Sequence, residues 1–212
     1  MYLSSNERAH QSMIDYLRFE RCCSAKIIDV LDDLRRDWFL PDDSDVEHFR
    51  PIPIGYSQTM SAPFIVASMT ELLEVVAGQK VLEIGSGCGY QTAVLLKLGA
   101  DVFSIEFVPE LVELGKSNLE KIGLIPKIRC GDGYYGWPEE QPFDRIIIAA
   151  TAPRIPEKLV DQLKIGGVMV LPVKKENREF MVRLRKTSGN VYALEWLYGV
   201  KFVPFVGYLA AN

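Results

Sequence analysis

The stretch that most constrains this fold is a strand that runs directly into a glycine-rich turn and then into a helix. Apolar residues 81–84 lead into three alternating glycines, Gly85, Gly87 and Gly89, and residues 91–98 carry the apolar spacing of a helix. Glycines in such a turn let backbone N–H groups approach a ligand without a Cβ in the way. The turn also directs the N-terminus of a helix at that ligand. The segment therefore predicts a binding site at the end of a buried strand.

An acidic residue at the end of the next strand strengthens this prediction. Residues 101–105 alternate as a strand and end at Glu106, 21 residues after Gly85. A carboxylate at this distance is placed to accept hydrogen bonds from a ribose diol. The alternative without a ligand is a tight turn followed by a surface glutamate. A nicotinamide oxidoreductase is a weaker interpretation, because the third glycine of the dinucleotide pattern G-x-G-x-x-G would fall at Tyr90.

The order of elements along the chain predicts an α/β fold with a mostly parallel central sheet and helices on both of its faces. Strands and helices alternate after residue 63, and a hairpin pattern follows. The expected strands are 81–84, 101–105, 127–130, 143–150 and 168–173, the helices are 64–76, 91–98, 109–122 and 155–163, and the hairpin strands are 180–186 and 192–202. The fourth strand is almost entirely apolar, as expected for a parallel sheet buried on both faces.

The first 63 residues form two further parts. Residues 1–41 predict two helices: a capping box, Ser4 with Glu7, precedes the first, and the second begins at Ser24 and is stopped by Pro41. Residues 42–63 predict a structured loop rather than a linker, because prolines and glycine punctuate them. In this loop Ser61 is expected to cap the helix that follows, and a helix N-terminus beside a hydroxyl can bind a carboxylate.

Composition excludes several classes of partner. The 212 residues carry a formal net charge of −4, so no basic surface for nucleic acid or an anionic membrane is indicated. No apolar run approaches the length of a membrane span and the first residues are too polar for a signal peptide, so we expect a cytoplasmic protein. The four cysteines, at 22, 23, 88 and 130, lack metal-binding spacing, so no metal site is expected.

Taken together, these motifs resemble a class I S-adenosylmethionine-dependent methyltransferase. The strand with E-x-G-x-G-x-G, the acidic end of the second strand, and Gly131-Asp132-Gly133 after the third carry the resemblance. Residues 52–63, IPIGYSQTMSAP, are similar to the signature loop of the protein-L-isoaspartate (D-aspartate) O-methyltransferase family, and residues 202–204, FVP, also match. The resemblance covers almost the whole chain and implies one Rossmann-like methyltransferase domain over 1–212. Its expected parts are a helical cap (1–41), a substrate-side loop (42–63), a cofactor-binding core (64–174) and a C-terminal hairpin (175–212).

The resemblance implies a role for each matching position. The glycine turn would surround the methionine part of the cofactor S-adenosyl-L-methionine, Glu106 would hold its ribose, and Asp132 would lie on the adenine side. Ser61 matches the active-site serine or threonine. The full set of implied cofactor-binding residues is Glu83, Gly85, Ser86, Gly87, Gly89, Glu106, Asp132, Gly133, Gln58 and Thr59, and the implied substrate-binding residues are Ser61, Ile54, His48 and Arg50.

Two positions depart from the pattern of the family. The family usually has an aspartate on the substrate side of the Ile-Gly pair, and residues 45–50, DVEHFR, have none at the usual offset; Ser57 replaces the usual glycine before Gln58. His48 and Arg50 are either a solvated loop face or replacements that favour a more acidic substrate segment.

The family reaction transfers a methyl group to the free carboxylate of L-isoaspartyl, and of D-aspartyl, residues in damaged proteins, and the ester then closes to a succinimide. A carboxylate is already ionised at neutral pH, so no catalytic base is required. The protein must instead align the oxygen, methyl carbon and sulfur. Isoaspartyl peptides and proteins are thus the expected partners. The protein itself is expected to be a monomer. Two alternatives stay open: a methyltransferase for another carboxylate, or a cofactor-binding protein without catalysis.

Overall fold

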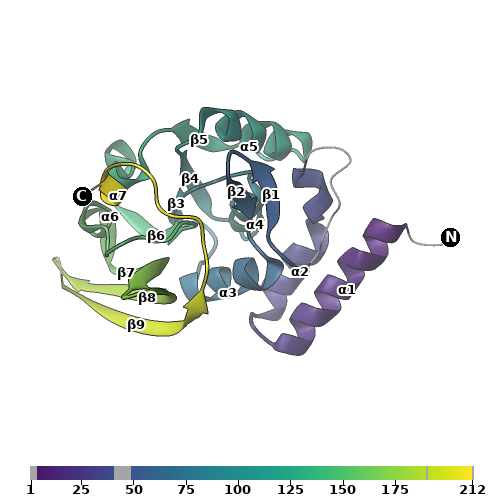
Figure 1. Cartoon of the computed structure of the whole chain (residues 1–212), viewed down its shortest axis with the longest axis horizontal. Helices are drawn as coiled ribbons and strands as arrows, with labels where there is room; N and C mark the ends of the chain where they lie inside the picture. Colours follow the sequence, from purple (N-terminus) through teal and green to yellow (C-terminus); the bar gives the residue numbers. More distant parts are fainter. Residues whose placement is uncertain (1–3, 41–48, 190, 212) are drawn as a thin grey trace.

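The computed structural model describes residues 4–40, 49–189 and 191–211, and a seven-stranded sheet forms its centre (Figure 1). Its strand order is β5-β4-β3-β6-β7-β8-β9. The bounds are β3 Lys80–Ile84, β4 Asp101–Glu106, β5 Lys127–Cys130, β6 Phe143–Ile148, β7 Leu163–Lys175, β8 Arg178–Ser188 and β9 Val191–Val200. Strands β3 to β7 are parallel, and β8 and β9 add antiparallel to β7 and to each other. The predicted α/β class, with a C-terminal hairpin, is confirmed.

The parallel strands are buried on both faces because helices cover both sides of the sheet. Along β3, Leu82 and Ile84 point into a core shared with α6, whereas Val81 points into a core shared with α3 and α4. The helices have the bounds α3 Pro63–Leu73, α4 Tyr90–Lys97, α5 Pro109–Lys121 and α6 Glu157–Gln162. This two-sided burial explains why the strands read as apolar runs.

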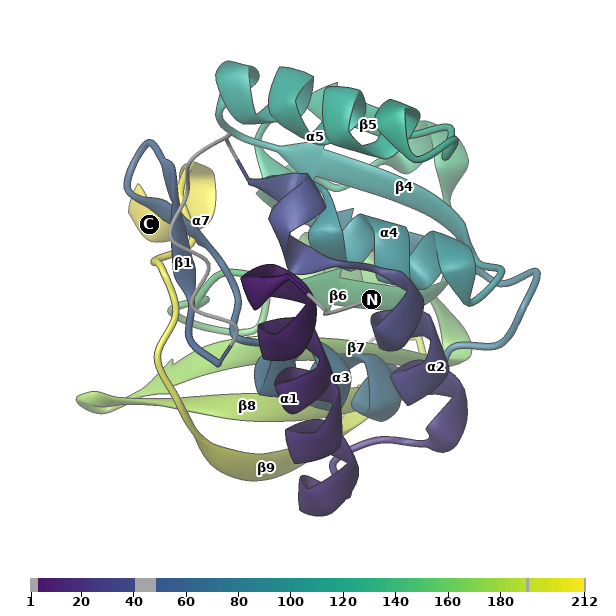
Figure 2. The same cartoon turned by 90° about the vertical axis from the view of Figure 1, so that its right-hand side faces the viewer.

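Two N-terminal helices, α1 Ser5–Glu20 and α2 Ala25–Asp33, pack against α3 and α4 (Figure 2). Ser4 and Glu7 form the predicted capping box at the start of α1. The second helix ends at Asp33, so its predicted end at Pro41 is wrong. A 3-10 turn, η1 Arg36–Phe39, follows instead and buries Phe39 against the body of the protein. Among the described residues, no helix has the length and apolar character needed to cross a membrane.

Part of the predicted loop 42–63 is a β-hairpin, formed by β1 Ile52–Gly55 and β2 Gln58–Met60. It is a two-stranded sheet separate from the large one, with Ile52 opposite Met60. Two non-glycine residues with positive φ, Tyr56 at +53° and Ser57 at +57°, make its turn. The sequence did not predict this hairpin for two reasons. Pro53 is atypical of a strand, and Tyr56-Ser57 differs from the Asn-Gly or Asp-Gly pair that is usual in a two-residue hairpin turn.

Several other predicted boundaries shift in the structure. Ala62, not Ser61, is the N-cap of α3, and Pro63 occupies the first turn without any side-chain cap. That helix ends at Leu73 rather than at Val76. Strand β7 begins at Leu163, five residues before the predicted start at 168. Two short 3-10 turns, η2 Gly133–Tyr135 and η3 Pro138–Glu140, and a last helix, α7 Tyr208–Ala211, complete the fold.

Candidate active site

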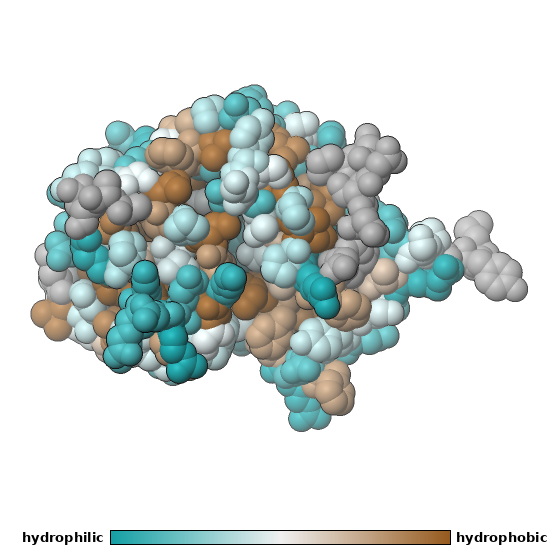
Figure 3. Space-filling model, viewed as in Figure 1, coloured by the Kyte–Doolittle hydropathy of each residue, from teal (hydrophilic) through white to brown (hydrophobic). Residues whose placement is uncertain are grey.

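A cavity of about 840 Å³, partly open to solvent, lies at the carboxyl ends of β3, β4 and β6. This edge is where ligands bind in open α/β sheets. Segments far apart in the chain form its wall. The face of the protein seen in Figure 3 is a mixture of apolar and polar side chains. The lining residues are Ile54, Gln58–Ser61, Val66, Ile84–Cys88, Tyr90, Gln91, Ile105–Val108, Gly133, Ala149, Ala150 and Val203–Val206.

The glycine turn forms the floor of this cavity. Gly85, Gly87 and Gly89 have φ of +88°, +52° and +89°, a region that side chains disfavour. Gly85 and Gly87 lie on the wall, but Gly89 does not: it is the N-cap of α4, and a Cβ there would meet the Gly115 carbonyl oxygen at 3.1 Å. Gly89 therefore allows close packing between α4 and α5, and its expected contact with the cofactor stays a prediction.

Ser86 adds a polar group to the floor. Its hydroxyl is buried, and no described residue forms a hydrogen bond with it. A buried hydroxyl without a partner is costly unless a ligand or water satisfies it. The geometry fits the expectation that a polar ligand occupies this cavity.

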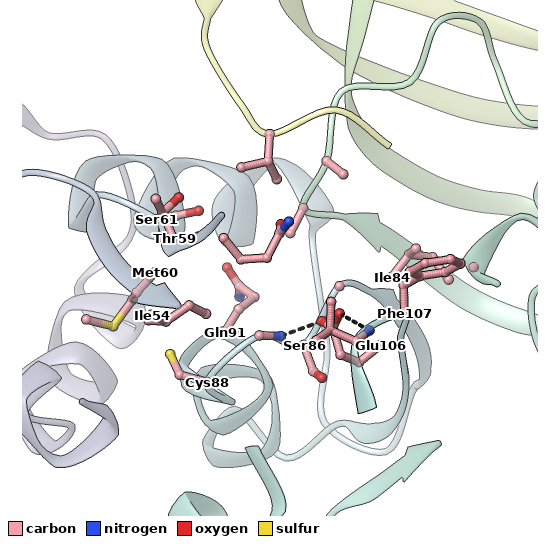
Figure 4. Close-up of a pocket in the computed structure, with 18 of the residues that line it drawn as sticks. Ile54, Thr59, Met60, Ser61, Ile84, Ser86, Cys88, Gln91, Glu106 and Phe107 are labelled. Carbon is pink, nitrogen blue, oxygen red and sulfur yellow. Dashed lines mark hydrogen bonds between the residues drawn. The ribbon is translucent and has the colours of Figure 1, made fainter. Parts of the chain in front are cut away.

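Glu106 stands at the end of β4 with its carboxylate already fixed. One oxygen accepts the Gly87 N–H at 2.9 Å and the other accepts the Val108 N–H at 3.0 Å (Figure 4). Each oxygen retains a further lone pair, so the group can still accept hydrogen bonds from a diol. Because the two N–H bonds hold it in one orientation, Glu106 is a preorganised acceptor on the cavity wall.

Glu83 lies beneath the turn and is absent from the wall. The alternation of β3 points its side chain toward α4, where it is fully buried. One carboxylate oxygen accepts hydrogen bonds from the hydroxyls of Thr92, at 2.6 Å, and Ser104. Burial raises the pKa of Glu83 to about 7, although the two hydrogen bonds act in the opposite direction and lower the pKa. In this structure Glu83 joins the strand and the helix on either side of the turn, and its expected role in cofactor binding stays a prediction.

Asp132 is also absent from the residues that line the cavity. Its two oxygens accept the backbone N–H groups of Tyr134, at 2.9 Å, and Tyr208, at 2.7 Å. The neighbouring Gly133 is the residue that reaches the wall, where a Cβ would lie 2.3 Å from Ile84 Cγ2. In this arrangement Asp132 holds the C-terminal segment through the Tyr208 N–H, and its expected place on the adenine side stays a prediction.

The β1–β2 hairpin forms the side of the cavity opposite the floor. Ile54, Gln58, Thr59 and Ser61, all predicted from the signature loop, line it. Thr59 and Ser61 lie together across the cavity from Ser86 and Glu106 (Figure 4). Ser61 directly precedes the N-cap of α3, so its hydroxyl lies beside the positive end of that helix.

Two further substrate residues, Arg50 and His48, were predicted from the sequence. Arg50 is exposed and does not line the cavity. His48 lies outside the described residues.

Sequence reasoning missed several wall residues. Ala149 and Ala150 directly follow β6, so the rule that ligands bind at the carboxyl ends of parallel strands could have found them. Gln91 could have been found from its place in the first turn of the helix after the glycines. Residues 203–206 carried no local signal of contact beyond the match at Phe202-Val203-Pro204.

A parallel sheet extended by antiparallel strands, with a glycine-turn floor and a carboxylate at the end of the second strand, defines the protein as a Rossmann-like class I methyltransferase. The model of the protein-L-isoaspartate(D-aspartate) O-methyltransferase family matches residues 7–210. The chain belongs to this family.

Individual relatives agree with this assignment. The chain is 42% identical over 200 residues to a protein-L-isoaspartate O-methyltransferase of Dictyoglomus turgidum, covering 93% of this chain and 90% of the relative. It is 46% identical over 157 residues to the same enzyme of Gloeobacter violaceus, covering 73% and 76%. A solved protein-L-isoaspartate O-methyltransferase superposes with a TM-score of 0.85 at 26% identity, over 94% of this chain and 67% of that one. A Plasmodium falciparum structure, solved with S-adenosyl-L-homocysteine, shares the fold with a TM-score of 0.83 at 23% identity, over 93% and 98%.

Proposed function

We propose that this protein transfers the methyl group of S-adenosyl-L-methionine to the free carboxylate of L-isoaspartyl, and also D-aspartyl, residues in damaged proteins. The observation that carries the proposal is the shared cavity: the donor-side floor of Gly85, Ser86 and Gly87 faces Ser61 on the signature hairpin. Membership of the family supports the same reaction. The product ester would then close to a succinimide without further help from the protein.

The donor would bind along the floor of the cavity. Glu106 would accept hydrogen bonds from the ribose hydroxyls, and the backbone at Gly85 and Gly87 would approach the methionine part closely. The unpartnered hydroxyl of Ser86 supports a polar ligand at this point. The sulfonium supplies an activated methyl group, and the chain's task is to hold the acceptor in line with it.

The acceptor carboxylate would be held from the hairpin side. It is ionised at neutral pH, so no residue has to remove a proton from it. The Ser61 hydroxyl can donate one hydrogen bond, and the N-terminus of α3 adds a favourable dipole. A neutral donor and a dipole orient the carboxylate while leaving an oxygen lone pair for the methyl carbon, whereas a bidentate arginine would engage both oxygens.

A selection of acidic substrate segments by Arg50 stays a prediction. Because Arg50 lies outside the cavity wall, we assign such selection to residues flanking the modified site rather than to the carboxylate itself. Comparing acidic and basic isoaspartyl peptides with the native protein and Arg50→Ala tests it, and equal KM ratios in both proteins would contradict it.

The test of the proposed function uses two peptides that differ only in L-isoaspartate or normal aspartate, with a radiolabelled methyl donor. Base-labile label on the isoaspartyl peptide alone is the expected result. Ser61→Ala should lower kcat/KM by about 10- to 100-fold, the effect of one lost hydrogen bond to a charged group, and leave binding of S-adenosyl-L-methionine by calorimetry unchanged. Ser12→Ala, an exposed serine on α1, is the control. Donor binding with no label on either peptide would refute the proposal and favour another acceptor or a non-catalytic role.

A further inference from the structure

Arg36 is a fully buried arginine whose partners are backbone carbonyls. It lies in η1, has 0% of its surface exposed, and is among the largest fully buried side chains. Its Nη1 donates to the carbonyl oxygen of Ser61 at 2.8 Å, and its Nη2 donates to that of Arg50 at 3.1 Å. Within the described part of the chain it makes no ion pair with a carboxylate.

The two carbonyls that Arg36 holds flank the β1–β2 hairpin. Arg50 lies two residues before β1 begins, and Ser61 directly follows β2. The hairpin itself has no strand pairing with the large sheet. One rigid guanidinium fork therefore spans the base of the hairpin and fixes both of its ends.

The same guanidinium also contacts the aromatic ring of Tyr90, the residue that directly follows the glycine turn. Its Cζ lies 5.4 Å from the ring centroid of Tyr90, the first residue of α4, which also lines the cavity. Phe39 packs edge-on against that ring with centroids 5.2 Å apart. Arg36 is thus in contact with both sides of the cavity, the hairpin on one side and the start of α4 on the other.

Burial of this charge is unfavourable by itself. Desolvation lowers the pKa of Arg36, and its Nε has no hydrogen-bond partner among the described residues. A packed apolar side chain of similar volume commonly gives equal or greater stability at such a position. What an apolar side chain cannot do is donate two directed hydrogen bonds to two carbonyls at once.

We propose that Arg36 is a positioning residue that sets the place of Ser61 relative to the donor floor by holding the carbonyls of Ser61 and Arg50 in one fork. The proposal rests on the proposed function, in which Ser61 holds the acceptor carboxylate. Displacement of a reacting group by about 1 Å can lower a rate by roughly 100-fold, so loss of this fork acts on turnover. Arg36 does not touch the acceptor or the donor.

The test compares Arg36→Lys with Arg145→Lys. Lysine keeps the charge but offers a single ammonium, which cannot reproduce the planar fork. Arg145 is a matched control because it also donates to a backbone carbonyl, that of Glu74, at 3.2 and 3.0 Å. It lies near the amino end of β6 and does not line the cavity, which is at the carboxyl end of that strand. We expect Arg36→Lys to lower kcat by about 10- to 100-fold with less than a threefold change in the Kd for S-adenosyl-L-homocysteine. Arg145→Lys should leave kcat unchanged.

Amide hydrogen exchange of residues 49–61, measured without peptide, is the second readout. Faster exchange confined to this hairpin in Arg36→Lys is expected, with the rest of the sheet protected as in the native protein. Unchanged kcat, or hairpin exchange equal to that of the native protein, would overturn the proposal. If Arg36→Lys does not fold, Arg36→Gln, which keeps an amide donor, takes its place with the same readouts. Because exchange needs no substrate, failure of the isoaspartyl assay in the native protein would refute the proposed function while leaving the test of the hairpin intact.

Discussion

Replacing Glu83 with glutamine should remove a pH dependence of stability that the buried carboxyl imposes. Burial raises the pKa of Glu83 from its ordinary value of 4.5 to about 7. Between these values the folded protein keeps a proton that the unfolded chain has released. Stability therefore falls as pH rises through this window and levels off above pH 7. The difference in pKa corresponds to roughly 3 kcal/mol of unfolding free energy.

The glutamine variant retains an acceptor for Thr92 and Ser104 but places an amide NH₂ where the second carboxylate oxygen has no partner. This unpaired donor costs about 1–3 kcal/mol at every pH. We therefore expect Glu83→Gln to be less stable than the native protein near pH 5 and equally or more stable near pH 8. The pH-dependent part of the difference is about 3 kcal/mol.

Urea unfolding at a series of pH values from 5 to 8 measures this difference directly. Glu113→Gln on α5, whose carboxylate is 78% exposed, is the control and should give a curve parallel to that of the native protein. Parallel curves for Glu83→Gln and the native protein would refute the reasoning, because they would mean that Glu83 ionises alike in the folded and unfolded states.

Three further substitutions test the cavity and its supports. Glu106→Gln should weaken binding of S-adenosyl-L-homocysteine at least tenfold by calorimetry, since a charged acceptor becomes an amide; unchanged affinity would remove Glu106 from the site. Gly89→Ala places a Cβ 3.1 Å from the Gly115 carbonyl oxygen at φ +89°, whereas Gly78→Ala places one in open space at φ +82°. Gly78→Ala should lower the unfolding free energy by about 1–2 kcal/mol, and Gly89→Ala should lower it by more; equal losses would contradict the packing role of Gly89. Lys186→Met should lower it by about 3 kcal/mol, because the buried ammonium donates to three backbone carbonyls at 2.7, 3.3 and 2.8 Å; a loss comparable to that of an exposed lysine would contradict this.

The central sheet could be predicted because its information is local. The strand bounds at 101–106 and 127–130 agree closely with the expected ones, and α5 Pro109–Lys121 differs from its prediction by one residue. Each element combines a clear apolar period with a glycine or proline at its boundary. The positions of Gly85, Ser86, Gly87 and Glu106 on the cavity wall follow from the same local pattern.

Features that the sequence did not predict arose mainly where distant segments decide the structure. The hairpin at 52–60 depends on Arg36, which lies earlier in the chain and holds its base. Asp132 faces the C-terminal segment because the Tyr208 N–H binds it, a contact across 76 residues. Glu83 appears in the motif as a ligand residue, yet strand alternation turns it toward α4. For the hairpin and for Asp132 the partner is distant in sequence, so no local pattern specifies it.

The contribution of residues 203–206 to the cavity has a consequence for how the protein is made. These residues are joined to Thr151 by backbone hydrogen bonds, Thr151 N to Val203 O at 2.8 Å and Phe205 N to Thr151 O at 2.9 Å. Domains fold progressively as they leave the ribosome, so the sheet can assemble while this segment is still being synthesised. The nascent chain nevertheless lacks part of its cavity wall until residue 206 has emerged. The cavity wall is therefore completed only after most of the residues of the hydrophobic core have been synthesised.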